Sequence, residues 1–343
     1  MSDSIRQAFH LQAQFCDALN SPLTAQVLRA LAGTLNHSTK TGARILDWPG
    51  DPMADALKLR IAGGLNALAR SGDDAELTQL YDGRTGDFPT VLKRVLSEWD
   101  DRLFTWLDSP PQTNEVARSG VLWPGLMEIA RRFGSNMELL ELGSSAGLNL
   151  NMDRFGYDLG GVKAGDLRSA LQLKPDWHGP QPPSARVNVV ARAGIDQNPL
   201  DASKPEVAER LLAYVWPDQL ERVARAEAAI SIARRFPPPI ESGDAADWIQ
   251  ARLSSPQTSG VTRVVFHSIV LQYLSPEGRA RVRSAIAEAG KRASNERPLV
   301  WLFMEFRKKG ATSPELCLQC WPGGDMESLA NVHPHGASIH WLG

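Results

Sequence analysis

A short run of small residues near the middle of the chain has the composition of a ligand-binding loop. Residues 139–150 read LLELGSSAGLNL, in which an apolar segment ends at Glu141 and two glycines follow. Small side chains let the backbone come close to a ligand, and the start of a following helix offers free N–H groups. In open α/β sheets, ligands bind where such a loop leaves the carboxyl end of a parallel strand. We therefore expect a binding loop formed by Glu141, Gly143, Ser144, Ser145 and Gly147.

The spacing within this loop favours one cofactor over another. Dinucleotide-binding proteins carry G-x-G-x-x-G, whose middle glycine admits the pyrophosphate of NAD or FAD. Here the pattern is E-x-G-x-x-x-G, and Ser145 stands where the middle glycine would be. S-adenosylmethionine (SAM) has no phosphate, and its ammonium group favours a nearby acid such as Glu141. The loop therefore predicts SAM as the cofactor.

Two acidic segments further along the chain agree with a nucleoside ligand. Gly194-Ile195-Asp196 ends the next apolar run, and a carboxylate there can accept two hydrogen bonds from ribose hydroxyls. In the segment 241–245, Glu-Ser-Gly-Asp-Ala, an acid can accept a hydrogen bond from the adenine amino group. We expect Asp196, Asp244 and Ala245 to contact the nucleoside.

Three residues could act as acids or bases. His267 ends an apolar run and could be a general base, because an unperturbed histidine titrates near neutrality; it could equally be a satisfied histidine in a buried strand end. Glu305 follows the apolar residues 301–304, where a carboxylate without a partner would have a raised pKa. His335, in the turn sequence HPHG, could touch substrate at the mouth of the sheet. His333, His335 and His340 could form a metal cluster, but no acid or cysteine lies at ligand spacing from them and Pro334 interrupts the strand, so we predict no metal site.

The same loop also matches a second motif. Residues 143–147 satisfy G-x-S-x-G, the nucleophile elbow of serine hydrolases, with Ser145 as the nucleophile. The acid would then be Asp244 or Glu305 and the base His333 or His335. The acid at Glu141, and the absence of an upstream HGGG-type segment, weigh against this reading. A protein that binds a ligand or partner without turnover is the third alternative.

The chain that positions these residues has two parts with different hydrophobic patterns. Residues 1–135 are patterned as successive amphipathic helices, and residues 136–343 alternate short apolar runs with helices. Such alternation predicts an α/β fold with a mostly parallel sheet covered by helices on both faces. The segment 156–185, rich in glycine and proline, is predicted to be an inserted loop. The expected strands are Met137–Leu142, Arg186–Ala193, Val261–His267 and Pro298–Phe306, the expected helices are 146–154, 203–235, 244–253 and 276–290, and an antiparallel hairpin of Leu316–Trp321 and Ser338–Leu342 is expected at the end.

The order of these motifs resembles the class I SAM-dependent methyltransferases over residues 135–343. The resemblance implies a Rossmann-like sheet whose fourth strand, with His267 and Ser268 at its end, faces the transferred methyl group. It also implies that Arg118, which otherwise belongs to a capped helix start, contacts the carboxylate of SAM. One departure is that Glu141 and Asp196 are 55 positions apart, whereas such acids are usually about 20 apart. The inserted segment must account for that difference.

A narrower resemblance covers almost the whole chain. The strings SPLTAQVL, QTNEVARSG, ELGSSAGLNLNMDRF, GIDQNPLD, YVWPDQLER, SGDA, FHS and HPHG are similar to a family of uncharacterised bacterial proteins. That family is catalogued as a domain of unknown function. It implies a methyltransferase-like fold and leaves the methyl acceptor open, either a small molecule or a protein.

The overall composition excludes several classes of partner. The net charge is −2 and no run of lysine or arginine stands out, so we expect no nucleic acid partner. No apolar stretch approaches the roughly 20 residues that span a bilayer, and no secretory signal pattern is visible at the N-terminus. Three cysteines do not make a disulfide framework. We therefore expect a cytoplasmic protein.

Overall fold

A computed structural model of the protein describes residues 2–83, 86–112, 114–308 and 310–343. The chain forms two compact units. The first consists of residues 1–113 and 204–227, and the second of residues 114–203 and 228–343. Within the described residues, no helix is long and apolar enough to cross a membrane.

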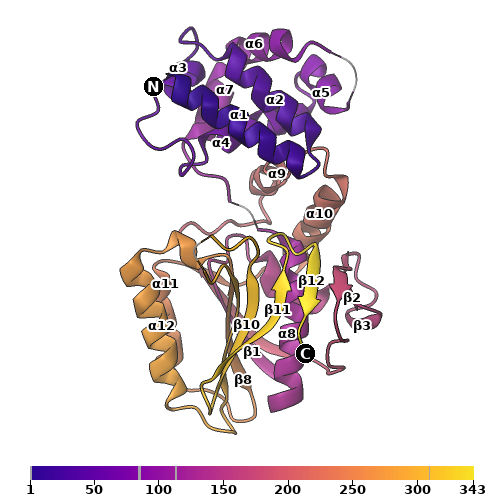
Figure 1. Ribbon diagram of the computed structural model, residues 1–343, viewed down its shortest axis with the longest axis vertical. Coiled ribbons are helices and arrows are strands. Elements are labelled where there is room, and N and C mark those ends of the chain that lie inside the picture. Colours follow the sequence, from indigo (N-terminus) through magenta and orange to yellow (C-terminus); the bar gives the residue numbers. More distant parts are fainter. Residues whose placement is uncertain (1, 84–85, 113, 309) are drawn as a thin grey trace. The chain divides into compact units, whose positions relative to one another are not determined.

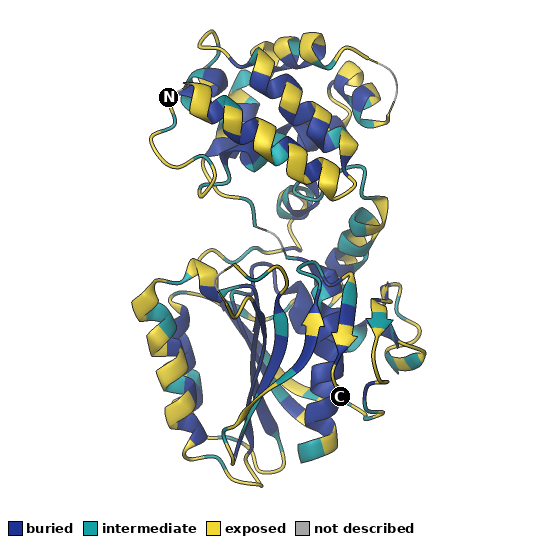
Figure 2. Ribbon diagram, viewed as in Figure 1, coloured by how far each residue is buried: buried dark blue, intermediate teal, exposed yellow. Residues whose placement is uncertain are grey.

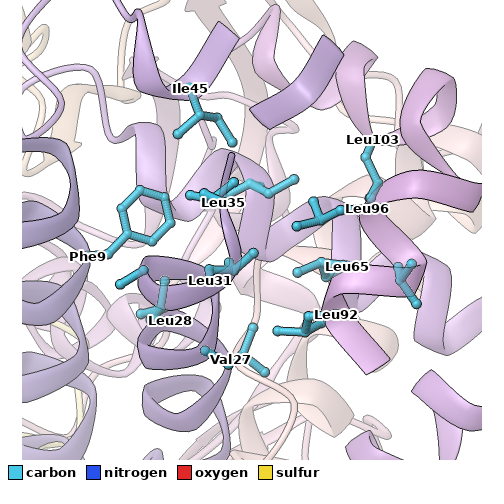
Figure 3. Close-up of a cluster of buried hydrophobic side chains, with 14 of the residues drawn as sticks. Phe9, Val27, Leu28, Leu31, Leu35, Ile45, Leu65, Leu92, Leu96 and Leu103 are labelled. Atoms are coloured by element: carbon cyan, nitrogen blue, oxygen red, sulfur yellow. The ribbon is translucent and has the colours of Figure 1, made fainter. Parts of the chain in front are cut away.

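The first unit is helical, as the sequence predicts. Figure 3 shows part of its core, in which Phe9, Leu31, Leu65 and Leu92 come from four different helices and are fully buried. Each such side chain contributes roughly 1.5–3 kcal/mol when it leaves water, so burial of this core stabilises the unit. Its elements are α1 (Ser2–Ala18), α2 (Pro22–Thr34), α3 (Lys40–Leu46), α4 (Leu57–Ser71), α5 (Ala75–Tyr81), α6 (Phe88–Glu98), α7 (Asp100–Phe104), the 3-10 helix η1 (Thr105–Leu107), α9 (Pro205–Ala213) and the first half of α10 (Leu220–Arg235).

The second unit is built on a nine-stranded sheet that contains the four strands expected before the C-terminal hairpin, together with a short strand at 240–242 that was not among them. Going across it, the strands lie in the order β7-β6-β1-β8-β9, which is 3-2-1-4-5 in chain order, so the direction of progression reverses between β1 and β8. Both β8 and β9 are buried along their whole length, as expected of central parallel strands (Figure 2). The bounds are β1 (Asn136–Leu142), β6 (Asn188–Asp196), β7 (Ile240–Ser242), β8 (Thr262–Ser268) and β9 (Leu299–Glu305).

Helices cover both faces of this sheet (Figure 1). Trp301 and Phe303 of β9 pack in one apolar cluster with α11 (Ala245–Ser254) and α12 (Pro276–Gly290). Leu302, which points the other way, meets Gly125 of α8 (Ser119–Phe133) so closely that a Cβ at this glycine would lie 2.7 Å from it. The α/β fold with a mostly parallel sheet and an N-terminal helical region is therefore confirmed.

The C-terminal part of the sheet differs from the predicted hairpin. The two predicted strands correspond to β10 (Glu315–Trp321) and β12 (Ser338–Trp341), but β11 (Met326–Val332) lies between them and pairs with both. Strand β11 is hard to predict from the sequence because its polar residues interrupt the apolar pattern. Glu327, for example, lies in this strand and binds Arg132 of α8. The hairpin is thus a three-stranded meander.

The insertion and the predicted helices also differ in detail. Residues 156–185 contain a small sheet of β2 (Gly156–Leu159), β3 (Val162–Gly165) and β4 (Gln172–Leu173), followed by β5 (Asp176–His178), which joins the main sheet beside β12. Tyr157 anchors the small sheet, because its ring stacks on Trp123 of α8 at 4.9 Å. The helix expected at 146–154 is the 3-10 helix η3 (Leu148–Arg154), and the helix expected at 203–235 is divided into α9 and α10.

Candidate functional site

The predicted site residues of the second unit come from one edge of the sheet, which we call the carboxyl edge. Strands β1, β6, β7, β8 and β9 are parallel and all end there. Since β10 is antiparallel to β9 and β11 antiparallel to β10, β11 also ends there, and the turn at 333–337 follows it. The topology therefore brings together segments that are up to about 200 positions apart in the sequence.

The loop after β1 is tightly curled. Gly143, Ser145 and Gly147 all have left-handed backbone angles, with φ of 67°, 53° and 65°. The N–H of Ser144 donates to the carbonyl oxygen of Ile195 in β6 at 3.0 Å, which fastens the loop to the neighbouring strand. A Cβ at Gly143 would lie 2.7 Å from a methyl carbon of Val270, so only glycine fits both this angle and this space.

Glu141 is a buried acid at the start of this loop. Its exposed fraction is 3%, and its Oε2 has no hydrogen-bond partner among the described residues. Burial, and then the nearby Asp196 carboxylate, raise the pKa of the Glu141 carboxyl well above its ordinary value. The buried Oγ of Ser145 likewise finds no partner in the part of the chain that the structure describes. Two such atoms in one loop call for an explanation, because buried polar atoms are normally satisfied.

Asp196 and Asp244 both bind backbone N–H groups. The two carboxylate oxygens of Asp196 accept from Ser145 N at 2.8 Å and from Asn198 N at 2.9 Å. Each oxygen keeps a second lone pair that another donor can use. Asp244 caps α11 by accepting from the N–H groups of Ala246 and Asp247, and the following Ala245 is buried. Its position at the carboxyl edge is the expected one, while its hydrogen bonds are those of a helix cap, and its Oδ1 also lies 3.6 Å from the guanidinium of Arg281.

His267 and Glu305 form a buried network. The Nδ1 of His267 lies 2.9 Å from Oε1 of Glu305, and Trp301 Nε1 donates to the Nε2 of His267 at 3.1 Å. Because Nε2 accepts, the ring proton is on Nδ1 and both nitrogens are engaged. The side chain of His267 is 0% exposed. This arrangement is that of a satisfied core histidine, one of the two alternatives that the sequence left open.

Glu305 also holds the turn after β8. Its Oε1 accepts from Val270 N at 2.7 Å and from Leu271 N at 3.0 Å. Burial alone would raise the pKa of the Glu305 carboxyl, but the hydrogen bonds from His267 and these two N–H groups hold it below its ordinary value. Ile269, which lies between the end of β8 and Val270, has a left-handed φ of 56°, and this angle is strained for a β-branched residue.

Arg118 connects three segments of the carboxyl edge. It ends the 3-10 helix η2 (Val116–Arg118), and its Nε donates to the carbonyl oxygen of Pro334 while its Nη1 donates to that of Ser268, both at 3.0 Å. The segment before it is also fastened to the loop after β1, since Asn114 Oδ1 accepts from Leu148 N at 2.9 Å. The guanidinium predicted to meet a ligand carboxylate thus binds two backbone carbonyls next to the site.

His335 faces an acid that the sequence did not single out as functional. Its Nδ1 lies 3.9 Å from Oε2 of Glu115, whose side chain is 6% exposed. The two residues are 220 positions apart, so spacing gave no signal of the pair. Among the residues that the structure describes, no group of three or more His, Cys, Asp or Glu side chains could hold a metal ion.

The comparisons with known proteins identify the family. The model of the DUF2332 family, described as an uncharacterized protein conserved in bacteria, matches residues 6–341. The chain therefore belongs to this family, and the predicted membership of an uncharacterised bacterial family is confirmed. No curated protein and no solved structure matches the chain.

Proposed function

We propose that this member of the DUF2332 family binds SAM at the carboxyl edge and transfers its methyl group to an acceptor, a small molecule or a protein group. The observation that carries the proposal is the buried Glu141, whose Oε2 the described residues leave without a partner. A buried acid without a partner is typical of a site where a bound ligand supplies the missing hydrogen bond. The left-handed glycine loop beside it, which lacks the glycine for a pyrophosphate, fits a cationic ligand without phosphate.

In this proposal, different residues of the carboxyl edge would contact different parts of SAM. Glu141 would receive the ammonium group, and Asp196 would use its remaining lone pairs for the ribose hydroxyls. Gly143, Ser144, Ser145 and Gly147 would line the ligand with backbone, and Asp244 and Ala245 would lie at the adenine. The strand order 3-2-1-4-5 supports a Rossmann-like methyltransferase sheet, because ligands bind where such an order reverses.

Methyl transfer from SAM requires mainly that the protein align the acceptor with the methyl group. SAM supplies an electrophilic methyl group, and most of the catalysis comes from holding the acceptor in line with it. Ser268 at the end of β8 and the turn that follows it, which Glu305 holds, would supply a rigid wall for this purpose. In this proposal His267 and Glu305 are positioning residues, because they act through the turn rather than on the reacting atoms.

Calorimetric titration with SAM and with S-adenosylhomocysteine (SAH) tests the proposal. We expect micromolar binding of both ligands to the wild-type protein and binding at least about tenfold weaker to Glu141→Gln, which loses a charged partner. Glu138→Gln is the matched control, since this acid lies on the same strand but binds Arg263 at 2.7 Å. Its affinity for SAH should equal that of the wild type. No binding of either ligand to the wild-type protein would refute the proposal.

A serine hydrolase is the second candidate, and one observation favours it. Ser145 has a strained left-handed φ on a turn from strand to helix, as a nucleophile elbow does. Against it, no histidine of the described ranges hydrogen-bonds to the Oγ of Ser145. Labelling of Ser145 by a fluorophosphonate, together with no binding of SAM, would favour the hydrolase. If both experiments are negative, a binding protein without catalysis is left.

A further inference from the structure

A buried acid and a partly exposed histidine face each other at the carboxyl edge. Glu115 Oε1 accepts from the N–H of Ala117 at 3.2 Å, which fixes the carboxylate, and its Oε2 lies 3.9 Å from His335 Nδ1. The side chain of Glu115 is 6% exposed and that of His335 is 36% exposed. At 3.9 Å the two atoms are within range of a charge interaction but are not hydrogen-bonded, and catalytic pairs of this kind often tighten only when substrate binds. An imidazole with one nitrogen toward a buried carboxylate and part of its ring open to solvent is arranged as a general base that the acid can orient.

The turn that contains His335 is fastened to η2, the 3-10 helix that Glu115 caps. Arg118 donates to the carbonyl oxygen of Pro334, the residue next to His335. On the other side, Gly336 has a φ of 71°, and a Cβ there would lie 2.4 Å from the carbonyl oxygen of Ala117. Glycine is required at this position because the turn presses directly on the backbone of η2. The approach of His335 to Glu115 is therefore built into the fold.

The same guanidinium ties the pair to the proposed methyl-transfer site. Arg118 Nη1 donates to the carbonyl oxygen of Ser268 at the end of β8. The side chain of Arg118 therefore binds both the backbone next to His335 and the end of β8. His335 and the wall proposed to face the methyl group lie at the same part of the carboxyl edge.

His267, which also lies at this edge, cannot act as the base. His267 is fully buried, and its two ring nitrogens are engaged by Glu305 and Trp301. Taking a proton on Nε2 would remove the hydrogen bond from Trp301 and place a charge in an apolar cluster. The sequence made both histidines candidates, and the geometry distinguishes them.

We propose that His335, oriented by Glu115, is the general base of the reaction, so that the acceptor is a hydroxyl or an amine whose nucleophilic atom carries a proton at neutral pH. This inference rests on the proposed function. The proton passes from the acceptor oxygen or nitrogen to Nε2 of His335. The acceptor's electron pair forms the new bond to the methyl carbon as the carbon–sulfur bond breaks, and its electrons stay on sulfur. Glu115 stabilises the imidazolium that results.

Nitrogen-15 NMR of the histidine rings tests the orientation without an acceptor. In the wild-type protein we expect neutral His335 to carry its proton on Nδ1, because the carboxylate of Glu115 selects that tautomer. In Glu115→Gln this preference should be lost. Glutamine keeps an oxygen for the N–H of Ala117, so the start of η2 is retained. His335→Gln assigns the signal, and His340→Gln on β12 is the control that should leave it unchanged.

Addition of SAH to the labelled protein tests the location. We expect the ring signals of His335 to shift on binding, and those of the exposed His340 to stay in place. If SAH binds but His335 does not shift, or carries its proton on Nε2, the inference is overturned and the proposed function stands. If SAH does not bind, the proposed function fails, and the assignment of His335 to methyl transfer fails with it.

Discussion

Replacement of Glu141 by glutamine is predicted to stabilise the protein increasingly as the pH rises. The pKa of this carboxyl is raised by burial and by Asp196 above its ordinary value of 4.5. Such a group contributes stability that is fully present below pH 4.5 and is lost as the pH rises toward the pKa of the folded state. Glutamine does not titrate. The difference in the free energy of unfolding should therefore move in favour of Glu141→Gln by about 1.4 kcal/mol per pH unit over that window.

Urea unfolding of the wild type and Glu141→Gln at pH 5, 6, 7 and 8 measures this difference. Glu138→Gln should instead lose stability, because it leaves the nearly buried Arg263 without its carboxylate partner. A difference between wild type and Glu141→Gln that does not change with pH would refute the reasoning. It would mean that the carboxylate has a partner in the free protein, so that no ligand is needed to complete it.

Three further predictions concern neighbouring residues. Glu305→Gln should cost roughly 1.5–3 kcal/mol of unfolding free energy at pH 7. Because the pKa of Glu305 is lowered in the folded state, this cost should shrink as the pH falls below 4.5. An equal cost at pH 4 and at pH 7 would contradict the hydrogen-bond network around Glu305. Gly143→Ala should lower the unfolding free energy by about 1–2 kcal/mol through its left-handed φ, with more from the contact with Val270; thermal unfolding that matches the wild type would show that the loop is not curled as described. Asp244→Ala should cost about 1 kcal/mol in urea unfolding as a lost helix cap. Asp247→Ala, three residues further along the chain, should cost clearly less because its ion pair with Arg281 is exposed; equal costs would contradict the role of Asp244 as the cap.

Strands β1, β6, β8 and β9 could be predicted from the sequence because each contains a short apolar run. Asp196 and Glu141 were recognised at strand ends for the same reason. The parallel strand β7 was not among the expected strands, since only one of its three residues is apolar. Strand β11 was missed because Glu327 and Asn331 interrupt its pattern, although hydrogen bonds to β10 and β12 hold it in place. The helix expected at 203–235 is interrupted near Pro217, since a proline cannot continue the backbone hydrogen bonds.

The partners of the site residues could not be predicted from the sequence. Residue type made His267 a candidate base, but its burial between Glu305 and Trp301 depends on the pairing of β8 with β9. Glu115 and His335 meet only because β11 ends at the carboxyl edge. Arg118 had two possible roles, and only the positions of Pro334 and Ser268 show which groups it binds. Contacts of this kind arise from tertiary structure, which local patterns do not encode.

A crystal structure of the protein with SAH tests the central proposal most directly. We predict that the amino group of SAH lies within about 3 Å of a carboxylate oxygen of Glu141 and that a ribose hydroxyl lies at a similar distance from Asp196. Density for SAH at another place, or no density at a saturating concentration, would contradict the assignment of the carboxyl edge as a SAM site.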